Sequence, residues 1–509
     1  MLRHLFLGIA TFSLAFSGLY AQSDNLLSND YWKGNPDLKS VKTEVAKGFD
    51  FSNLVGMKDP IMLAMSNGAS PEIVNYLIDQ PGVDVSRLLV ENRIYLHVAA
   101  NAGKAEVVDH LLEKGSDINF LDGNAHTAFS YAGFQGHLTK EMIDVFVKHG
   151  VDLNKTYETK DDANILLISI PYDKDLEITD YLVFKGVSIK SLDGKGNTAF
   201  NHAAKIGYVG TMKELVKRGV AYNDNALFIA AQGTYRHANS IDVFQYLVDD
   251  LNITPTILDE HKRNVLHYVA KKNDQLAIVN YFLAKGVDVN QIDEDGQTPF
   301  MVACGNRSSE VVNAMLPKVN SKLINQKNSD GQTALMLAVE KGDAQTVENL
   351  LKQKADVKVK DNKGNTLVAY LVNSYPVAKK GGRGFRGTTI EKEQEKFFSK
   401  LNLLKDAGLD FSATQAKGET AYHLAAAKND VKLLKTLSEL NIDINGQDDT
   451  GATALHVAAL AAENDKILQY LISVEANKQI ENEFGETAYD LAKENETLKS
   501  DHVSVAFLK

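Results

Sequence analysis

Cysteine is almost absent from this sequence of 509 residues, in which Cys304 is the only one. A single thiol excludes both an internal disulfide and the cysteine pairs of structural zinc sites, so packing must supply the stability. We expect Cys304 to be a small buried side chain, as free cysteines usually are. The His-Glu-x-x-His metal motif and the Gly-x-Ser-x-Gly nucleophile motif are absent as well. We therefore predict no catalytic residue, no metal and no cofactor, and a protein that is not an enzyme.

An excess of basic residues is also lacking. The chain has 55 Lys and Arg residues against 66 Asp and Glu residues, which gives a net charge of −11 at pH 7. Binding to nucleic acid depends on concentrated Lys and Arg contacts with phosphate, so we predict no nucleic-acid partner. Hydrophobic residues make up 44% of the chain and charged residues 24%, which is typical of a folded protein.

The one long apolar run lies at the N-terminus. Arg3 and His4 give a positive start, residues 5–16 are mostly apolar, and small or neutral residues lead through Ala21 to Gln22. This order is typical of a secretory signal peptide, and the run is too short to span a bilayer comfortably. We predict a signal peptide at 1–21, a periplasmic or secreted protein, and no membrane span after signal removal.

A short repeat fills most of the remaining chain. The segment Asp-Gly-Gln-Thr-Pro-Phe-Met-Val-Ala at 295–303 returns as Asp-Gly-Gln-Thr-Ala-Leu-Met-Leu-Ala at 330–338. The threonines of successive copies are spaced by 33 to 35 residues, and they are Thr298, Thr333 and Thr366, then Thr420, Thr453 and Thr487. Thr366 and Thr420 are 54 apart, so one copy carries an insertion of roughly twenty residues. The copies near 163–190 and 223–253 lack the threonine, and we expect irregular turns or helices there.

Each copy predicts a turn followed by two short helices. Asp-Gly is turn chemistry, and the threonine can cap the first helix, whose buried side is made of small residues. A second stretch such as Val107–Leu112 carries apolar residues at the i, i+3 and i+4 positions of a helix face. A glycine in a left-handed conformation is then expected to end it, at Gly115, Gly150, Gly186, Gly219, Gly286 and Gly408.

The repeat closely resembles the ankyrin repeat, with its Asp-Gly turn, Thr-Pro-Leu-His element, paired leucines and Gly-Ala-Asp-x-Asn ending. The resemblance implies an all-α solenoid of stacked helix-turn-helix units, from which hairpin fingers project. On this basis the chain divides into the signal peptide at 1–21, a lead-in with a capping half-repeat at 22–56, about twelve repeats at 57–480 with an inserted loop near 374–396, and a C-terminal capping repeat and tail at 481–509.

Four histidines occupy one position of the repeat, and they are His97, His267, His423 and His456. Ligands of one zinc ion must converge within about 2.1 Å of it, whereas these residues lie a repeat or more apart. We predict that each imidazole is structural and bridges neighbouring turns by hydrogen bonds.

The inserted loop holds a basic run that is unusual in an acidic chain. Its string Gly382-Arg-Gly-Phe-Arg-Gly387 matches a dinucleotide-binding pattern, but it follows helical sequence rather than a strand, which disfavours that reading. Two alternatives stay open, a solvated loop and a contact loop for an acidic partner. The candidate contacts are Lys379, Lys380, Arg383, Phe385 and Arg386.

The resemblance implies an unknown protein partner, bound on the concave face and the hairpin tips. Candidate tip contacts are Asp122, Asn124, Asp193, Lys195, Asp293, Glu294, Asp330 and Asn362. We expect a monomer that acts as an exported scaffold for protein–protein interaction. The alternatives are an enzyme with a site grafted on the irregular repeats, and a stress-protective or immunity-type binding protein of the cell envelope.

Overall fold

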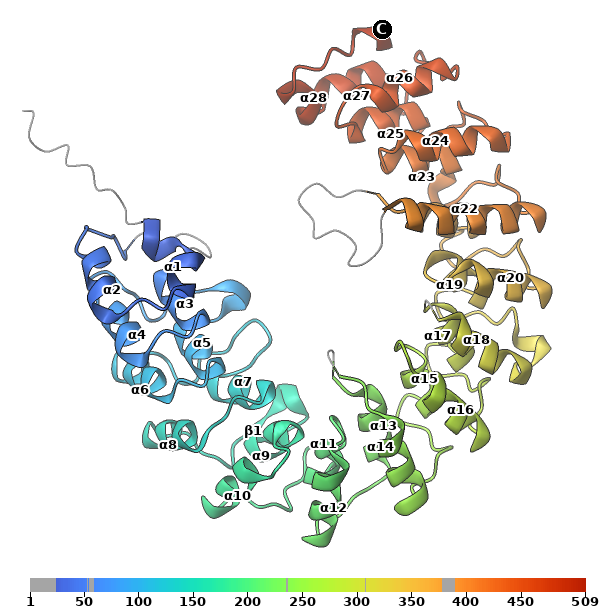
Figure 1. The fold of residues 1–509 in the computed structure, drawn as a ribbon. Helices are drawn as coiled ribbons and strands as arrows, with labels where there is room; N and C mark the ends of the chain where they lie inside the picture. Colours follow the sequence, from blue (N-terminus) through green and yellow to red (C-terminus); the bar gives the residue numbers. More distant parts are fainter. Residues whose placement is uncertain (1–23, 53, 55–58, 235–236, 307, 378–389) are drawn as a thin grey trace, which may run out of the picture. The chain divides into compact units, whose positions relative to one another are not determined.

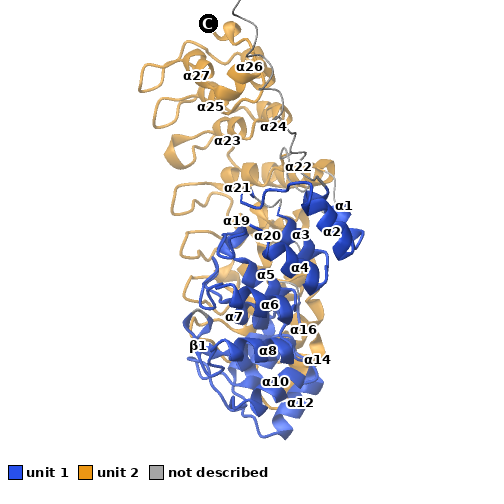
Figure 2. Cartoon of the chain, turned by 90° about the vertical axis from the view of Figure 1, so that its left-hand side faces the viewer, with its two compact units in different colours: residues 1–239 blue, residues 240–509 orange. Residues whose placement is uncertain are grey.

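Helix pairs repeat along the chain in the computed structural model, which describes residues 24–52, 54, 59–234, 237–306, 308–377 and 390–509 (Figure 1). Contacts divide the chain into two compact units, residues 1–239 and 240–509 (Figure 2). The predicted signal peptide and the basic run of the insertion lie outside the described residues. No helix in the described part combines the length and the apolar character that crossing a membrane requires.

Unit 1 contains thirteen α-helices and one pair of very short strands within its described residues. The elements are α1 Asn29–Lys33, α2 Leu38–Val45, α3 Pro60–Ser66, α4 Pro71–Ile78, α5 Tyr95–Asn101, α6 Ala105–Glu113, α7 Ala128–Gln135, α8 Lys140–Lys148, β1 Thr156–Tyr157, β2 Ala163–Asn164, α9 Ile165–Ser169, α10 Glu177–Phe184, α11 Ala199–Ala203, α12 Val209–Lys217 and α13 Asn225–Gln232.

Unit 2 contains fifteen α-helices within its described residues. They are α14 Ile241–Gln245, α15 Val265–Val269, α16 Leu276–Ala284, α17 Pro299–Cys304, α18 Ser309–Met315, α19 Ala334–Glu340, α20 Ala344–Lys352, α21 Leu367–Asn373, α22 Ile390–Asp406, α23 Ala421–Ala427, α24 Val431–Leu437, α25 Ala454–Ala461, α26 Lys466–Ser473, α27 Ala488–Glu494 and α28 Glu496–Ser500.

The first helix of a pair, the inner helix, packs against the inner helix of the next pair. In unit 1 the series runs from α5 through α7, α9 and α11 to α13, and in unit 2 from α15 through the odd-numbered helices to α27. Small buried side chains such as Ala99 and Ala100 in α5, or Ala425 and Ala426 in α23, permit this close approach. The all-α repeat architecture predicted from the sequence is confirmed.

Helix starts and ends follow the predicted residues. The hydroxyls of Thr127, Thr198, Thr298 and Thr333 accept a backbone N–H from the first turn of their helices. The six glycines predicted to end helices all have positive φ, and they are Gly115, Gly150, Gly186, Gly219, Gly286 and Gly408.

The two copies without a threonine are irregular, as predicted. In the first, β1 pairs antiparallel with β2 around a 3-10 turn at Glu158–Lys160, and Asn164 replaces threonine as the cap of α9. In the second, Asp224 precedes α13 without a side-chain cap. The outer helix there, α14, is only five residues long and continues as a π-helical turn at Tyr246–Asp250.

The predicted insertion is only partly a loop. Residues from Ile390 onward are helical, and they begin α22, which has 17 residues and is the outer helix of its repeat. Phe397, Leu401 and Leu404 bury the apolar side of α22. The extra residues therefore lengthen an outer helix as well as its connection, which the spacing of the threonines alone did not indicate.

Candidate functional site

We use the word finger for the five-residue turn, such as 122–126, that precedes an inner helix. An aspartate or asparagine at its first position folds most of the fingers. One carboxylate oxygen of Asp122 accepts the backbone N–H groups of Asn124 and His126, both at 2.9 Å. Asp193 and Asp293 each accept the equivalent two N–H groups of their own fingers. These local hydrogen bonds hold the turn closed.

Seven fingers are each joined to the preceding finger by one backbone hydrogen bond. The second residue of a finger donates its N–H to the carbonyl oxygen of the third residue of the preceding finger. In unit 1 these bonds run from Gly123 to Glu91 and from Gly194 to Asp161. In unit 2 they run from Glu294 to His261, Ser329 to Asp295, Asn362 to Asp330, Asp449 to Lys417 and Glu483 to Thr450. The fingers that are joined in this way are held in register with one another.

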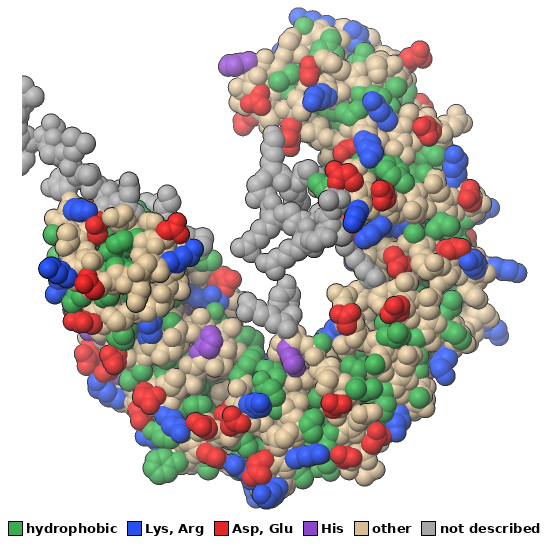
Figure 3. All heavy atoms as spheres, viewed as in Figure 1, with side chains coloured by type: hydrophobic (Ala, Val, Ile, Leu, Met, Phe, Trp, Pro, Cys, Tyr) green, Lys and Arg blue, Asp and Glu red, His purple; other side chains and the backbone are tan. Residues whose placement is uncertain are grey.

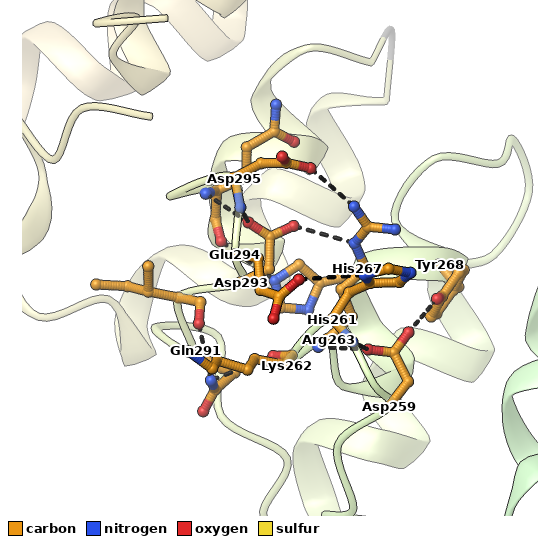
Figure 4. A network of polar contacts seen from close by, with 12 residues as sticks. Asp259, His261, Lys262, Arg263, His267, Tyr268, Gln291, Asp293, Glu294 and Asp295 are labelled. Atoms are coloured by element: carbon orange, nitrogen blue, oxygen red, sulfur yellow. Dashed lines mark hydrogen bonds and ion pairs between the residues drawn. The ribbon is translucent and has the colours of Figure 1, made fainter. Parts of the chain in front are cut away.

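Side chains reinforce this link between two fingers of unit 2 (Figure 4). Arg263, the last residue of the finger at 259–263, contacts Asp293 at 3.1 Å and Asp295 at 2.8 Å in the next finger. Burial alone would lower the pKa of Arg263, but its hydrogen bonds to Asp293 and Tyr268 raise it above its usual value. The carboxylate of Glu294 lies 3.2 Å from the ring of His261.

The four repeated histidines bridge neighbouring repeats, as predicted. Nε2 of His423 lies 2.9 Å from the carbonyl oxygen of Ala452 in the next finger, and Nδ1 lies 2.8 Å from the hydroxyl of its helix cap, Thr420. His97, His267 and His456 make the same Nε2 contact with His126, Gln297 and Glu486. Burial lowers the pKa of His97, His267 and His456, which favours the neutral imidazole. In the described part of the chain, no three His, Cys, Asp or Glu residues are grouped so that they could hold a metal ion.

The predicted tip contacts fall into two groups. Asp122, Asp193 and Asp293 are buried, and their carboxylates are engaged within the fingers. Although burial alone would raise the pKa of Asp122, N–H donors from His126 and Asn124 and the Arg93 guanidinium hold it below its usual value. The structure therefore gives these three aspartates a role in the framework, and we leave them out of the proposed binding surface.

The other five tip residues are exposed, and they are Asn124, Lys195, Glu294, Asp330 and Asn362. Their role as partner contacts stays a prediction. The five candidate residues of the insertion, Lys379, Lys380, Arg383, Phe385 and Arg386, lie outside the described residues, as does the glycine string that contains them.

A set of exposed aliphatic side chains was not anticipated from the sequence. Each member directly precedes the first residue of a finger. In unit 1 they are Leu88, Leu121 and Leu192, which are 59%, 55% and 57% exposed. In unit 2 they are Leu258 and Ile292. We call these five residues the finger row. The signal was present in the sequence as an apolar residue at one fixed position beside five of the turns.

The same position is polar in the later fingers of unit 2. Lys327 and Lys360 occupy it. Each donates from its ammonium group to the carbonyl oxygen of the residue just before the next finger, Lys360 and Thr414 respectively. Thr414, Gln447 and Glu481 follow at the equivalent places. The fold therefore does not require an apolar residue there. Acidic and basic side chains are mixed over the face shown in Figure 3, so a broad field of one sign does not mark a site on that face.

Comparison with known proteins agrees with this architecture. A family model described as ankyrin repeats (3 copies) matches residues 61–157, 96–191, 165–259, 266–361 and 393–495. A putative ankyrin repeat protein of Rickettsia felis is 26% identical over 45% of the chain and 61% of its own length. The NAD-dependent deacetylase sir2B of Dictyostelium discoideum is 22% identical over 66% of the chain and 42% of its own length.

A homolog of the transient receptor potential cation channel subfamily A member 1 in Caenorhabditis elegans is 26% identical over 39% of the chain. The chain spans 16% of that relative, and less than two thirds of each relative named here. The matches to the repeat model, by contrast, cover most of the chain from residue 61 to residue 495. Together with the capped helix pairs, the bridging histidines and the linked fingers, they show that the chain belongs to the ankyrin-repeat family.

Proposed function

We propose that this protein is a non-enzymatic scaffold that binds another protein through its finger row. The observation that carries the proposal is the exposure of Leu88, Leu121 and Leu192 at one position of the repeat in unit 1. Exposed aliphatic surface is unfavourable in water, and burying it against a partner contributes roughly 25 cal/mol per Å². Because later fingers carry Lys, Thr, Gln or Glu there, packing within the repeat does not explain the leucines.

Ankyrin repeats generally mediate protein–protein interaction, and this supports the proposal. The names of the relatives differ widely, from a channel homolog to a deacetylase. The chain therefore shares the repeats with them, and not one activity. A standard interface buries about 800 Å² on each partner, which a few neighbouring fingers and inner helices can supply.

We further propose that the protein works outside the cytoplasm, in the periplasm or after secretion. The apolar run that follows Arg3 and His4 supports this, together with the small residues before Gln22. Expression of the full chain in a bacterial host, with N-terminal sequencing of the exported product, tests it. We expect a mature N-terminus at or near Gln22, and retention of Met1 in a cytoplasmic product would contradict the proposal.

Affinity capture tests the role of the finger row. The partner is captured from an extract of the exporting organism and identified by mass spectrometry. The triple variant Leu88→Ser, Leu121→Ser and Leu192→Ser should capture at least tenfold less of this partner than the wild type. Phe184→Ser is the matched control, because Phe184 is 80% exposed on the outer helix α10 rather than on a finger. Circular dichroism should be unchanged in both variants. Equal capture by the triple variant and the wild type would reject the finger row as the binding surface.

A further inference from the structure

One aromatic ring in unit 1 lies beside side chains from three successive repeats, two of which are lysines. The ammonium groups of Lys160 and Lys205 lie 5.3 and 5.4 Å from the centre of the Phe134 ring, and the His126 ring lies 5.1 Å from it. His126 belongs to one finger, Lys160 lies in the irregular finger of the next repeat, and Lys205 follows the inner helix α11. We call these four residues the Phe134 cluster.

Neither lysine of the cluster has a carboxylate partner or a hydrogen bond from its ammonium group within the described residues. Three carboxylates of the neighbouring fingers are already engaged. Arg93 contacts Asp122, Lys195 contacts Asp161, and His202 contacts Asp193. Burial, together with the nearby charge of Lys160, lowers the pKa of Lys205. Two cations held close together and partly desolvated without a counter-charge are unfavourable, and an incoming anion would relieve that cost.

A second, independent observation also marks the cluster. The His126 side chain is only 5% exposed, and its Nε2 has no hydrogen-bond partner in the described part of the chain. Its other ring nitrogen, Nδ1, lies 3.3 Å from the carboxylate of Asp122. Burial lowers the pKa of His126, so its imidazole is neutral, and with Nδ1–H directed at Asp122 the unpartnered Nε2 is a hydrogen-bond acceptor. A backbone N–H of a bound segment could satisfy this nitrogen beside the two lysines.

We propose that the Phe134 cluster receives an acidic side chain, Asp or Glu, of the protein that the scaffold binds. A carboxylate between the two ammonium groups would form charge-assisted hydrogen bonds with both, and the methylene groups of that side chain would pack on the Phe134 ring. The inference rests on the proposed function in one respect, the identity of the ligand as a protein segment. The location supports this, because Leu121 of the finger row lies in the chain next to the finger that contains His126. The partner segment would then combine an acidic residue with apolar neighbours.

Fluorescence anisotropy with a fluorescein-labelled hexaglutamate amide tests the cluster without a known partner. The double variant Lys160→Gln and Lys205→Gln should weaken binding at least tenfold relative to the wild-type full chain, because both charge-assisted contacts are lost. The matched control is Lys39→Gln with Lys190→Gln, which removes the same charge from exposed positions of unit 1 and should change affinity less than twofold. Circular dichroism should be identical for both double variants.

Three outcomes would overturn the proposal. Equal weakening by both double variants would show non-specific attraction, and equal binding of labelled hexaglutamine would show that carboxylates are not recognised. Full displacement of hexaglutamate by millimolar inorganic phosphate would assign the cluster to small anions instead. The finger-row triple variant should bind hexaglutamate normally, since the probe has no apolar side chains. Failure of the cluster is therefore distinguishable from failure of the proposed function.

Discussion

The backbone N–H of Asn362 donates a hydrogen bond of 3.0 Å to the carbonyl oxygen of Asp330 in the preceding finger. Gly331, which follows Asp330 in the chain, adopts a φ of +77°, and a Cβ atom at this glycine would lie 2.6 Å from the Asn362 nitrogen and would also clash with the Asn362 Oδ1. The finger link therefore depends on the absence of a side chain at residue 331.

The first prediction concerns this close approach. Gly331→Ala should lower the free energy of unfolding by about 2–4 kcal/mol, because a left-handed alanine costs about 1–2 kcal/mol and the clash with Asn362 adds to it. Gly364→Ala is the matched control, since Gly364 also has positive φ but has open space around its Cβ position. Urea denaturation followed by circular dichroism measures both. Equal loss in the two variants would show that the finger link tolerates a methyl group.

The bridging histidines predict a loss of stability on mild acidification. Burial lowers the folded-state pKa of His97, His267 and His456, so the unfolded chain binds more protons between that pKa and the unfolded value of about 6.5. Stability is therefore unaffected by these groups above about pH 6.5 and falls as the pH drops through this window. Thermal unfolding measured at both pH values should give a lower melting temperature at pH 5.5 than at pH 7.5.

A single histidine variant isolates this contribution. His456→Gln removes one buried imidazole, which contacts the Thr453 hydroxyl at 2.9 Å and the Glu486 carbonyl at 3.1 Å. It should lower stability at pH 7.5 by about 1–3 kcal/mol, yet reduce the difference between the two pH values. An unchanged pH dependence would remove His456 from the group of titrating residues.

The only thiol should be inert in the folded protein. Cys304 is fully buried in α17, and burial raises the pKa of its thiol, which disfavours the reactive thiolate. Ellman's reagent should label the native protein at least a hundredfold more slowly than the protein in 6 M guanidinium chloride. Rapid labelling under native conditions would instead place Cys304 at an accessible surface.

A helix cap in the first irregular repeat gives the fourth prediction. Asn164 caps α9 through the backbone N–H of Leu167 at 3.1 Å, and its amide also donates to the Ser191 hydroxyl at 2.9 Å. Asn164→Ala should cost about 1–2 kcal/mol, whereas Asn164→Thr, the cap of the regular repeats, should cost less than half as much. Equal costs for the two substitutions, measured by urea denaturation, would show that the cap itself contributes little.

Much of the fold could be predicted because the same helix caps, turn residues and apolar positions recur in several copies of the repeat. The threonine caps, the left-handed glycines and the bridging histidines all lie where the spacing places them. The length of α22 could not be predicted, because the additional residues between Thr366 and Thr420 follow no repeated pattern.

The candidate site was harder to predict. The carboxylates at the finger tips suggest an exposed polar surface, but Asp122, Asp193 and Asp293 face their own backbone N–H groups instead. The exposure of Leu121 becomes evident only once the fingers are built. Lys160 and Lys205 are 45 positions apart and flank the irregular repeat, so no periodic alignment of the sequence brings them to one ring.

The backbone bonds between fingers have an evolutionary consequence. Since the bond that joins these turns is made by main-chain atoms, the side chain just before a turn can vary without removing that bond. Leu, Ile, Lys, Thr, Gln and Glu already occupy this position along one chain. Under the proposed function, a single substitution here would change one point of the binding surface and leave the supporting architecture intact.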